Sequence, residues 1–147
     1  MASPKKLIRG RFPKLGIADF KLTSPETDDY NCIGWAAGVN HQFWWPSDDY
    51  YWPSEAPRVE SIEAFIAAFA TVGYVRSADA TLKEGFEKIA IYVGSSGKPT
   101  HAARLLADGR WTSKLGPYKD ISHRTLFGLE GGEYGTVSVF MERALPA

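Results

Sequence analysis

The sequence predicts an α+β domain in which N-terminal helices pack on a C-terminal antiparallel β-sheet. In the first half of the chain, apolar residues recur at the three- and four-residue spacing of an amphipathic helix. In the second half the apolar period changes to two, the period of a strand with one buried face. Helical patterns followed by a run of strand patterns are typical of α+β domains. The 147 residues fit one such domain.

Two segments carry the helical patterns. The first begins at Cys32, within YNCIGWAAG (residues 30–38), and the second is VESIEAFIAAFATVG (residues 59–73). Residues 1–12 are basic and polar, and we expect them to form a loose N-terminal arm. Residues 12–22 are expected to be irregular chain.

Four strands are expected in the second half: residues 88–93, 100–106, 110–115 and 136–143. Turn sequences with glycine separate the first three of them. GPYKDISH (residues 116–123) is mainly polar and is expected to be a loop. These strands would follow one another as antiparallel neighbours.

The charges of the chain balance, with 17 lysine and arginine residues against 17 aspartate and glutamate residues. Proteins that mainly grip nucleic acid need an excess of basic surface, so we expect no nucleic-acid partner. No apolar run approaches the roughly 20 residues that span a bilayer, so we expect no membrane partner. Because the basic N-terminus lacks the apolar segment of a signal peptide, the expected compartment is the cytoplasm. Delivery by a non-classical secretion route is also compatible with the sequence.

Cys32 is the single cysteine, which excludes an internal disulfide. A thiol at the start of a helix is easier to ionise, because unpaired backbone N–H groups and the helix dipole favour the thiolate. A free cysteine is equally often a small buried hydrophobe. Position alone leaves these two interpretations about even.

A nucleophilic cysteine needs a base, and the chain has three histidines. His41 lies far along from Cys32, near the end of the same short helix. His101 begins an expected strand, where its imidazole can point at a helix packed on the sheet. The alternative for His101 is a structural hydrogen bond at a strand end.

HAARLLADGRWTSK (residues 101–114) and YNCIGWA (residues 30–36) resemble the histidine and cysteine segments of the NlpC/P60 family of papain-like cysteine peptidases and amidases. The resemblance implies a single papain-like domain over residues 1–147. It also implies Cys32 as nucleophile and His101 as general base, with a third polar residue that orients the imidazole.

The third residue has three candidates. The position that usually carries a histidine in the family falls on Ser113, which orients an imidazole only weakly. We favour Asp120 for its charge, with His123 second and Ser113 third. For each of them the alternative is a residue that makes local hydrogen bonds within the loop.

Five residues around the cysteine are candidates for substrate binding: Tyr30, Asn31, Trp35, Trp44 and Trp45. Asn31 has a stronger alternative as the cap of the cysteine helix. The aromatic loop, FWWPSDDYYW (residues 43–52), is expected to be irregular because prolines interrupt it. Three roles are open for this loop: it lines a substrate subsite, it binds a partner through its aromatic side chains, or it packs around the core.

The first functional hypothesis is a thiol hydrolase that acts on a peptide or acyl-amide substrate through an acyl-enzyme at Cys32. The resemblance adds peptidoglycan-derived peptides as a substrate class. Deamidation and acyl transfer use the same machinery. The second hypothesis is a non-catalytic binding domain that uses the aromatic loop. No cofactor and no metal are expected, since Asp48 and Asp49 lack further spaced ligands.

Overall fold

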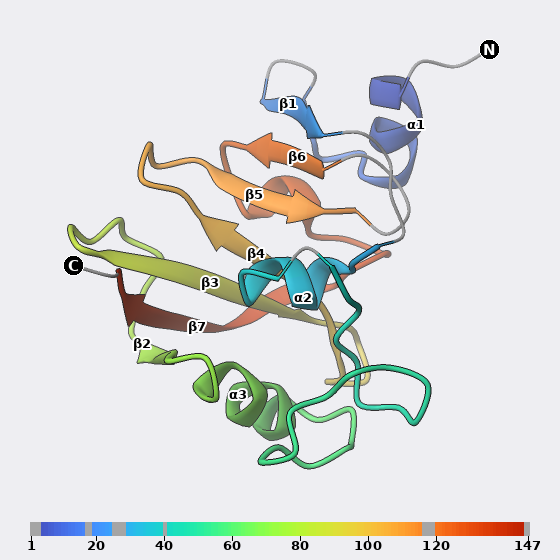
Figure 1. The fold of residues 1–147 in the computed structure, drawn as a ribbon. Helices are drawn as coiled ribbons and strands as arrows, with labels where there is room; N and C mark the ends of the chain where they lie inside the picture. The colour runs from blue at the N-terminus through green and yellow to red at the C-terminus, as the bar shows by residue number, and fades with distance from the viewer. Residues whose placement is uncertain (1–3, 17–18, 25–28, 40, 116–119, 146–147) are drawn as a thin grey trace.

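The computed structural model describes residues 4–16, 19–24, 29–39, 41–115 and 120–145. Its centre is a seven-stranded antiparallel sheet with the spatial order β1-β6-β5-β4-β3-β7-β2 (Figure 1). The strands are β1 (Phe20–Ser24), β2 (Val75–Ser77), β3 (Phe86–Val93), β4 (Pro99–Leu105), β5 (Trp111–Lys114), β6 (Asp120–His123) and β7 (Thr136–Ala144). The helices are α1 (Pro4–Arg11), α2 (Cys32–Ala36) and α3 (Ile62–Ala70), with a 3₁₀ turn η1 (Phe127–Leu129).

The predicted fold class, a papain-like NlpC/P60-type α+β domain with N-terminal helices packed on a C-terminal sheet, is wrong. The described α-helices have only 8, 5 and 9 residues, too few to build a helical layer. β1 and β2, which precede all the expected strands in the chain, form the two edges of the sheet. The molecule is therefore mostly sheet, and the short helices lie among its strands and loops.

Three local predictions also need correction. The segment expected to be a loose arm contains α1, whose Ile8 is buried. The segment expected to be irregular runs into β1 from Phe20. The expected loop contains β6, whose four residues are all buried. Its polar side chains led to the prediction of a loop, because the hydrogen-bond partners that allow them to be buried lie elsewhere in the chain. The other four expected strands are confirmed to within two residues as β3, β4, β5 and β7.

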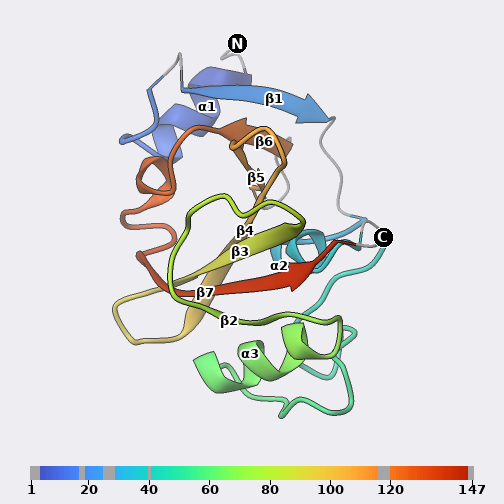
Figure 2. The same ribbon diagram turned by 90° about the vertical axis from the view of Figure 1, so that its left-hand side faces the viewer.

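Each face of the sheet has its own core. Figure 2 shows α1 and the loop that carries η1 on one side, with α2 on the other. The first core combines α2, α3 and the aromatic loop with β3, β4 and β7, through Ile33, Phe65, Phe69, Ile91, Ala102 and Met141 among others. The second combines α1 and η1 with alternate residues of the same sheet, through Ile8, Tyr92, Ala103, Leu105, Ile121 and Leu129 among others.

One edge of β4 is only partly covered by a strand. β4 pairs with β3 along most of its length, with an irregularity at Thr100, but it pairs with β5 only at Arg104 and Leu105. α2 contacts both β4 and β5. The short helix thus fills the place where the two strands separate, and this brings its first residue, Cys32, to the part of the β4 backbone that does not pair with β5.

Candidate active site

The start of α2 is fixed by Asn31. Its side-chain oxygen accepts hydrogen bonds from Gly34 N at 3.0 Å and from Trp44 N at 3.0 Å, and its amide nitrogen donates to Trp44 O at 2.8 Å. The side chain therefore caps the helix and ties it to the aromatic loop. Cys32, the next residue, is held in place by these bonds.

The Cys32 thiol lies against the backbone of β4. Its sulfur is 4.0 Å from Thr100 O, and the Ala102 N–H points at it. Although the residue as a whole keeps some exposure, burial of the sulfur raises the pKa of the thiol to about 11. The backbone N–H groups of Ala102, Ile33 and Cys32 and the Lys114 charge act in the opposite direction, and burial exceeds them. The resting group is a neutral thiol.

We predict that Cys32 in the folded protein reacts slowly with iodoacetamide. A pKa of about 11, against 9.0 for the unperturbed thiol, lowers the thiolate fraction at pH 7.5 about 100-fold. The alkylation rate, measured by intact mass, should therefore rise about tenfold per pH unit up to pH 10. The urea-unfolded protein is the control and should react at the ordinary rate. A folded-state rate at pH 7.5 that equals the rate of free cysteine would contradict the prediction.

Three side chains, one each from β4, β5 and β6, form a buried hydrogen-bonded chain. His101 Nε2 lies 3.0 Å from Ser113 Oγ, Ser113 Oγ lies 2.8 Å from His123 Nε2, and His123 Nδ1 lies 2.9 Å from Thr125 O. His101, Ser113 and His123 are each 0 % exposed. The chain joins β4, β5 and β6.

The carbonyl at the end of the chain sets the direction of every bond. Thr125 O only accepts, so His123 Nδ1 carries the proton and its Nε2 carries a lone pair. Ser113 must then donate its one hydroxyl proton to His123, and its oxygen accepts from His101 Nε2–H. This assignment requires neutral rings, and burial lowers the pKa of His123 to about 4 and that of His101 well below 6.5. His101 Nδ1 is therefore a buried lone pair.

His101 Nδ1 has no hydrogen-bond partner among the described residues. The His101 ring lies on the α1 side of the sheet, where Tyr134 and Tyr92 contact it. The body of α2 packs on the opposite side, with Ala102. Cys32 packs against the core on the α2 side, and its sulfur approaches Thr100 O and the Ala102 N–H, the β4 backbone on both sides of His101.

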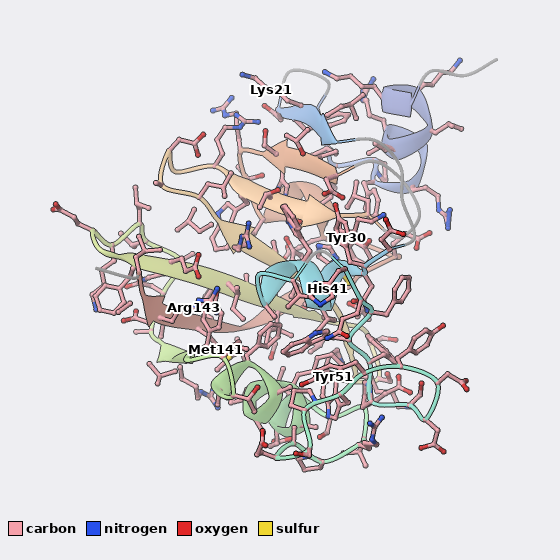
Figure 3. The ribbon with its side chains drawn as sticks, in the orientation of Figure 1. Lys21, Tyr30, His41, Tyr51, Met141 and Arg143 are labelled. Carbon is pink, nitrogen blue, oxygen red and sulfur yellow. The ribbon has the colours of Figure 1, made fainter. Side chains whose placement is uncertain are left out.

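Asp120 and Tyr30 form a separate polar pair. The Tyr30 hydroxyl donates a short hydrogen bond to Asp120 Oδ2, and the Tyr30 ring stacks on Trp35 at 5.5 Å. The structure thus brings Ser113 and His123 to His101 and brings Asp120 to Tyr30. Figure 3 shows Tyr30 close to α2. The fully buried Lys114 pairs with Asp120 in the β5–β6 register, and its Nζ lies 5.7 Å from the centre of the Tyr30 ring.

The aromatic loop serves largely as core. Trp44 is 3 % exposed, and Trp45 packs edge-on against Phe65 of α3 at 5.4 Å. Tyr51, on the same loop, is 46 % exposed (Figure 3). Of the predicted substrate-binding residues, Asn31 caps α2, and Trp44 and Trp45 pack into the core that the loop shares with α3.

Other parts of the described chain offer less chemistry. No group of three or more His, Cys, Asp or Glu residues there is arranged to hold a metal ion. None of the described helices is long and apolar enough to cross a membrane. A hollow of about 370 Å³ near β2 contains Lys88, but its Nζ is satisfied by Asp79 O and Oδ1 at 3.1 and 3.0 Å.

Sequence reasoning missed Tyr134, which stacks on His101 at 4.0 Å between ring centroids with 7° between the planes. The glycines in EGGEYG signal a tight backbone turn but do not say where the tyrosine points. It also missed the Thr125 carbonyl, because a backbone acceptor has no sequence signature.

Comparison with known proteins gives one family. A model described as a domain of unknown function (DUF7689) matches residues 21–142. No curated protein and no solved structure matches the chain. The matched segment contains every residue of the His101–Ser113–His123 chain, as well as Cys32.

Proposed function

The chain belongs to the DUF7689 family of unknown function, and we propose from the chemistry of its site that it is a thiol hydrolase acting on amide or ester bonds. Cys32 is the nucleophile, and His101 Nδ1 is the general base. Ser113 and His123 orient the imidazole. The likeness of the two segments to NlpC/P60 motifs supports the choice of residues, although the layout of that family is absent.

The observation that carries the proposal is the direction of the buried hydrogen-bonded chain. A histidine that serves as a base toward a thiol needs a lone pair on the nitrogen that faces it and a proton on the other nitrogen. The Thr125 carbonyl, relayed by His123 and Ser113, imposes that tautomer on His101. A merely structural histidine would not need its second nitrogen left as a buried, unpartnered lone pair.

In the proposed reaction the sulfur of Cys32 attacks the substrate carbonyl carbon as its proton passes to His101 Nδ1. The imidazolium then gives this proton to the leaving amine or alcohol, and a thioester remains on Cys32. Water attacks the thioester and loses a proton to Nδ1; the carbon–sulfur bond then breaks, Nδ1 returns the proton to the sulfur, and the carboxylic acid leaves with the Cys32 thiol restored. Ser113 Oγ accepts from Nε2–H throughout, and His123 stabilises its orientation.

The neutral resting state defines the type of catalysis. Burial raises the pKa of the thiol and lowers the pKa of the imidazole, so the two groups do not rest as an ion pair. Proton transfer must accompany attack, as in hydroxyl nucleophiles that use a histidine base. Between pH 6 and 8 the acylation rate should be nearly flat, because His101 is already unprotonated there.

We expect p-nitrophenyl acetate to leave an acetyl group on Cys32, detected by intact mass and peptide mapping. His101→Gln should slow this acylation about 100-fold or more, the usual contribution of a general base, and Cys32→Ser should abolish the cysteine adduct. His41→Gln is the matched control, since His41 is exposed, and should leave the rate unchanged. An acylation rate that is the same in His101→Gln and in the unsubstituted protein would overturn the proposal.

A second candidate is a non-catalytic binding domain. The observation that favours it is the burial of the thiol, which holds the pKa of Cys32 at about 11. In that case the unsubstituted protein and His101→Gln would acylate equally slowly. If the enzyme proposal holds, a product screen with water and with amines as acceptors separates hydrolysis and deamidation from acyl transfer.

A further inference from the structure

The loop between η1 and β7 is closed by glycines. Gly131 N donates to Gly135 O at 3.0 Å, and Gly135 N donates to Gly131 O at 2.7 Å. Gly135 has a φ of 79°, and a Cβ there would lie 1.9 Å from Val93 O. The loop therefore lies directly against the end of β3, with no room for a side chain at the contact.

This loop places Tyr134 over His101. The two rings are nearly parallel, with centroids 4.0 Å apart, and Tyr92 meets the same imidazole edge-on at 5.3 Å. The His101 ring is thus covered on one face by Tyr134, flanked by Tyr92 and held at Nε2 by Ser113. Rotation of the imidazole would require displacement of at least one of these contacts.

Thr100 connects the Tyr134 loop to the thiol. Its hydroxyl donates to Tyr134 O at 2.5 Å, and its carbonyl lies 4.0 Å from Cys32 Sγ. On the outer side, Glu133 pairs with Arg11 of α1 at 2.8 Å. Two neighbouring residues of the loop, Glu133 and Tyr134, are thus anchored, and one of their anchors is Thr100, the residue that precedes His101.

We propose that Tyr134 is a positioning residue for His101: its ring fixes the imidazole plane and excludes water, so that Nδ1 stays an unprotonated base. This inference rests on the proposed function for its catalytic meaning. Removal of the ring admits water, which solvates the imidazolium and lets the ring turn. Among the described residues, the titratable and charged groups that face His101 and this loop are His123 through Ser113, Tyr92, Tyr134 and Cys32, with Glu130, Glu133 and Arg11 at the rim.

The test is a ¹⁵N NMR titration of the three histidines without substrate, with His101 assigned through His101→Gln. In the unsubstituted protein, His101 should show the Nε2–H tautomer and a titration midpoint well below the ordinary histidine value, because burial lowers its pKa. Tyr134→Ala should raise its titration midpoint by at least about one pH unit and produce a mixture of tautomers. Tyr134→Phe, which keeps the stacked ring, should restore the original behaviour.

Two glycine variants keep the test decisive if Tyr134→Ala does not fold. Gly135→Ala leaves Tyr134 intact but forces the loop away from β3, and should shift the His101 titration in the same direction. Gly132→Ala is the matched control, since a Cβ there meets nothing within 4 Å. An unchanged titration and tautomer in Tyr134→Ala and Gly135→Ala, with only a lower melting temperature, would overturn the inference.

The two proposals fail separately. If His101→Gln acylates at the normal rate, the thiol hydrolase is lost, yet the titration still tells whether Tyr134 controls the imidazole. If the titration is insensitive to Tyr134 while His101→Gln is slow, the hydrolase stands and Tyr134 is only packing.

Discussion

Acidification from pH 7.5 to pH 5.0 should lower the free energy of unfolding by about 2 kcal/mol through His123 alone. Burial lowers the pKa of His123 from 6.5 to about 4 in the folded protein. Below pH 6.5 the unfolded chain therefore binds a proton that the folded chain does not bind, and the free energy of unfolding decreases as the pH falls to about 4. The pKa of His101 is also lowered, by burial and by His123, so His101 adds a loss of the same sign.

Urea unfolding at both pH values measures this loss. The lowered pKa values of Asp79 and Glu142, set first by hydrogen bonds from Lys88 and Lys83, act in the same direction but only below the ordinary carboxyl range. His123→Gln should lose much of the pH dependence above pH 5, whereas His41→Gln should keep it. Equal stability of the unsubstituted protein at pH 7.5 and pH 5.0 would contradict the buried neutral state of these histidines.

Ser113→Ala should destabilise the fold by about 3 kcal/mol. It leaves two buried groups without a hydrogen-bond partner, and each such group costs about 1–3 kcal/mol. These groups are the His101 Nε2–H and the His123 Nε2 lone pair. The substitution also releases the tautomer of His101, so acylation of Cys32 should slow as well. The midpoint of urea unfolding at pH 7.5 and the acetylation rate are the two measurements.

Thr112→Val is the matched control for Ser113→Ala. Thr112 is the preceding residue of β5, is 2 % exposed and donates one neutral hydrogen bond to Ile121 O at 3.1 Å. Its loss should cost about 1 kcal/mol and leave the acylation rate unchanged. If the two variants lose the same stability and acylate alike, the Ser113 hydroxyl does not join the two histidines.

Of the strands that could be predicted from sequence, β3, β4 and β7 carry mainly apolar side chains, whereas the polar β5 was indicated by the Asp-Gly turn before it. Ile89 and Ile91 on β3, and Ala103 and Leu105 on β4, show the two-residue period directly. β6 could not be predicted in this way, since Asp120, Ser122 and His123 are polar although buried. The helical layer was overestimated because a local apolar period does not say how many turns the surrounding structure allows.

The candidate site divides in the same way. A cysteine at a capped helix start and a histidine on a strand are local features, so sequence could nominate Cys32 and His101. The order among Ser113, His123 and Asp120 depends on the β5–β6 register, which pairs Trp111 with His123. That register sets Ser113 and His123 diagonally on one face, within reach of each other. Without a predicted β6, no such register could be assigned.

The separation of β4 from β5 has a consequence for solubility. A bare strand edge is a template on which another chain can add by backbone pairing. Along the first half of β4 this template faces α2, and the thiol and the helix occupy the place that a foreign strand would take. The helix that carries the candidate nucleophile therefore also blocks the unpaired part of β4 from pairing with a strand of another molecule.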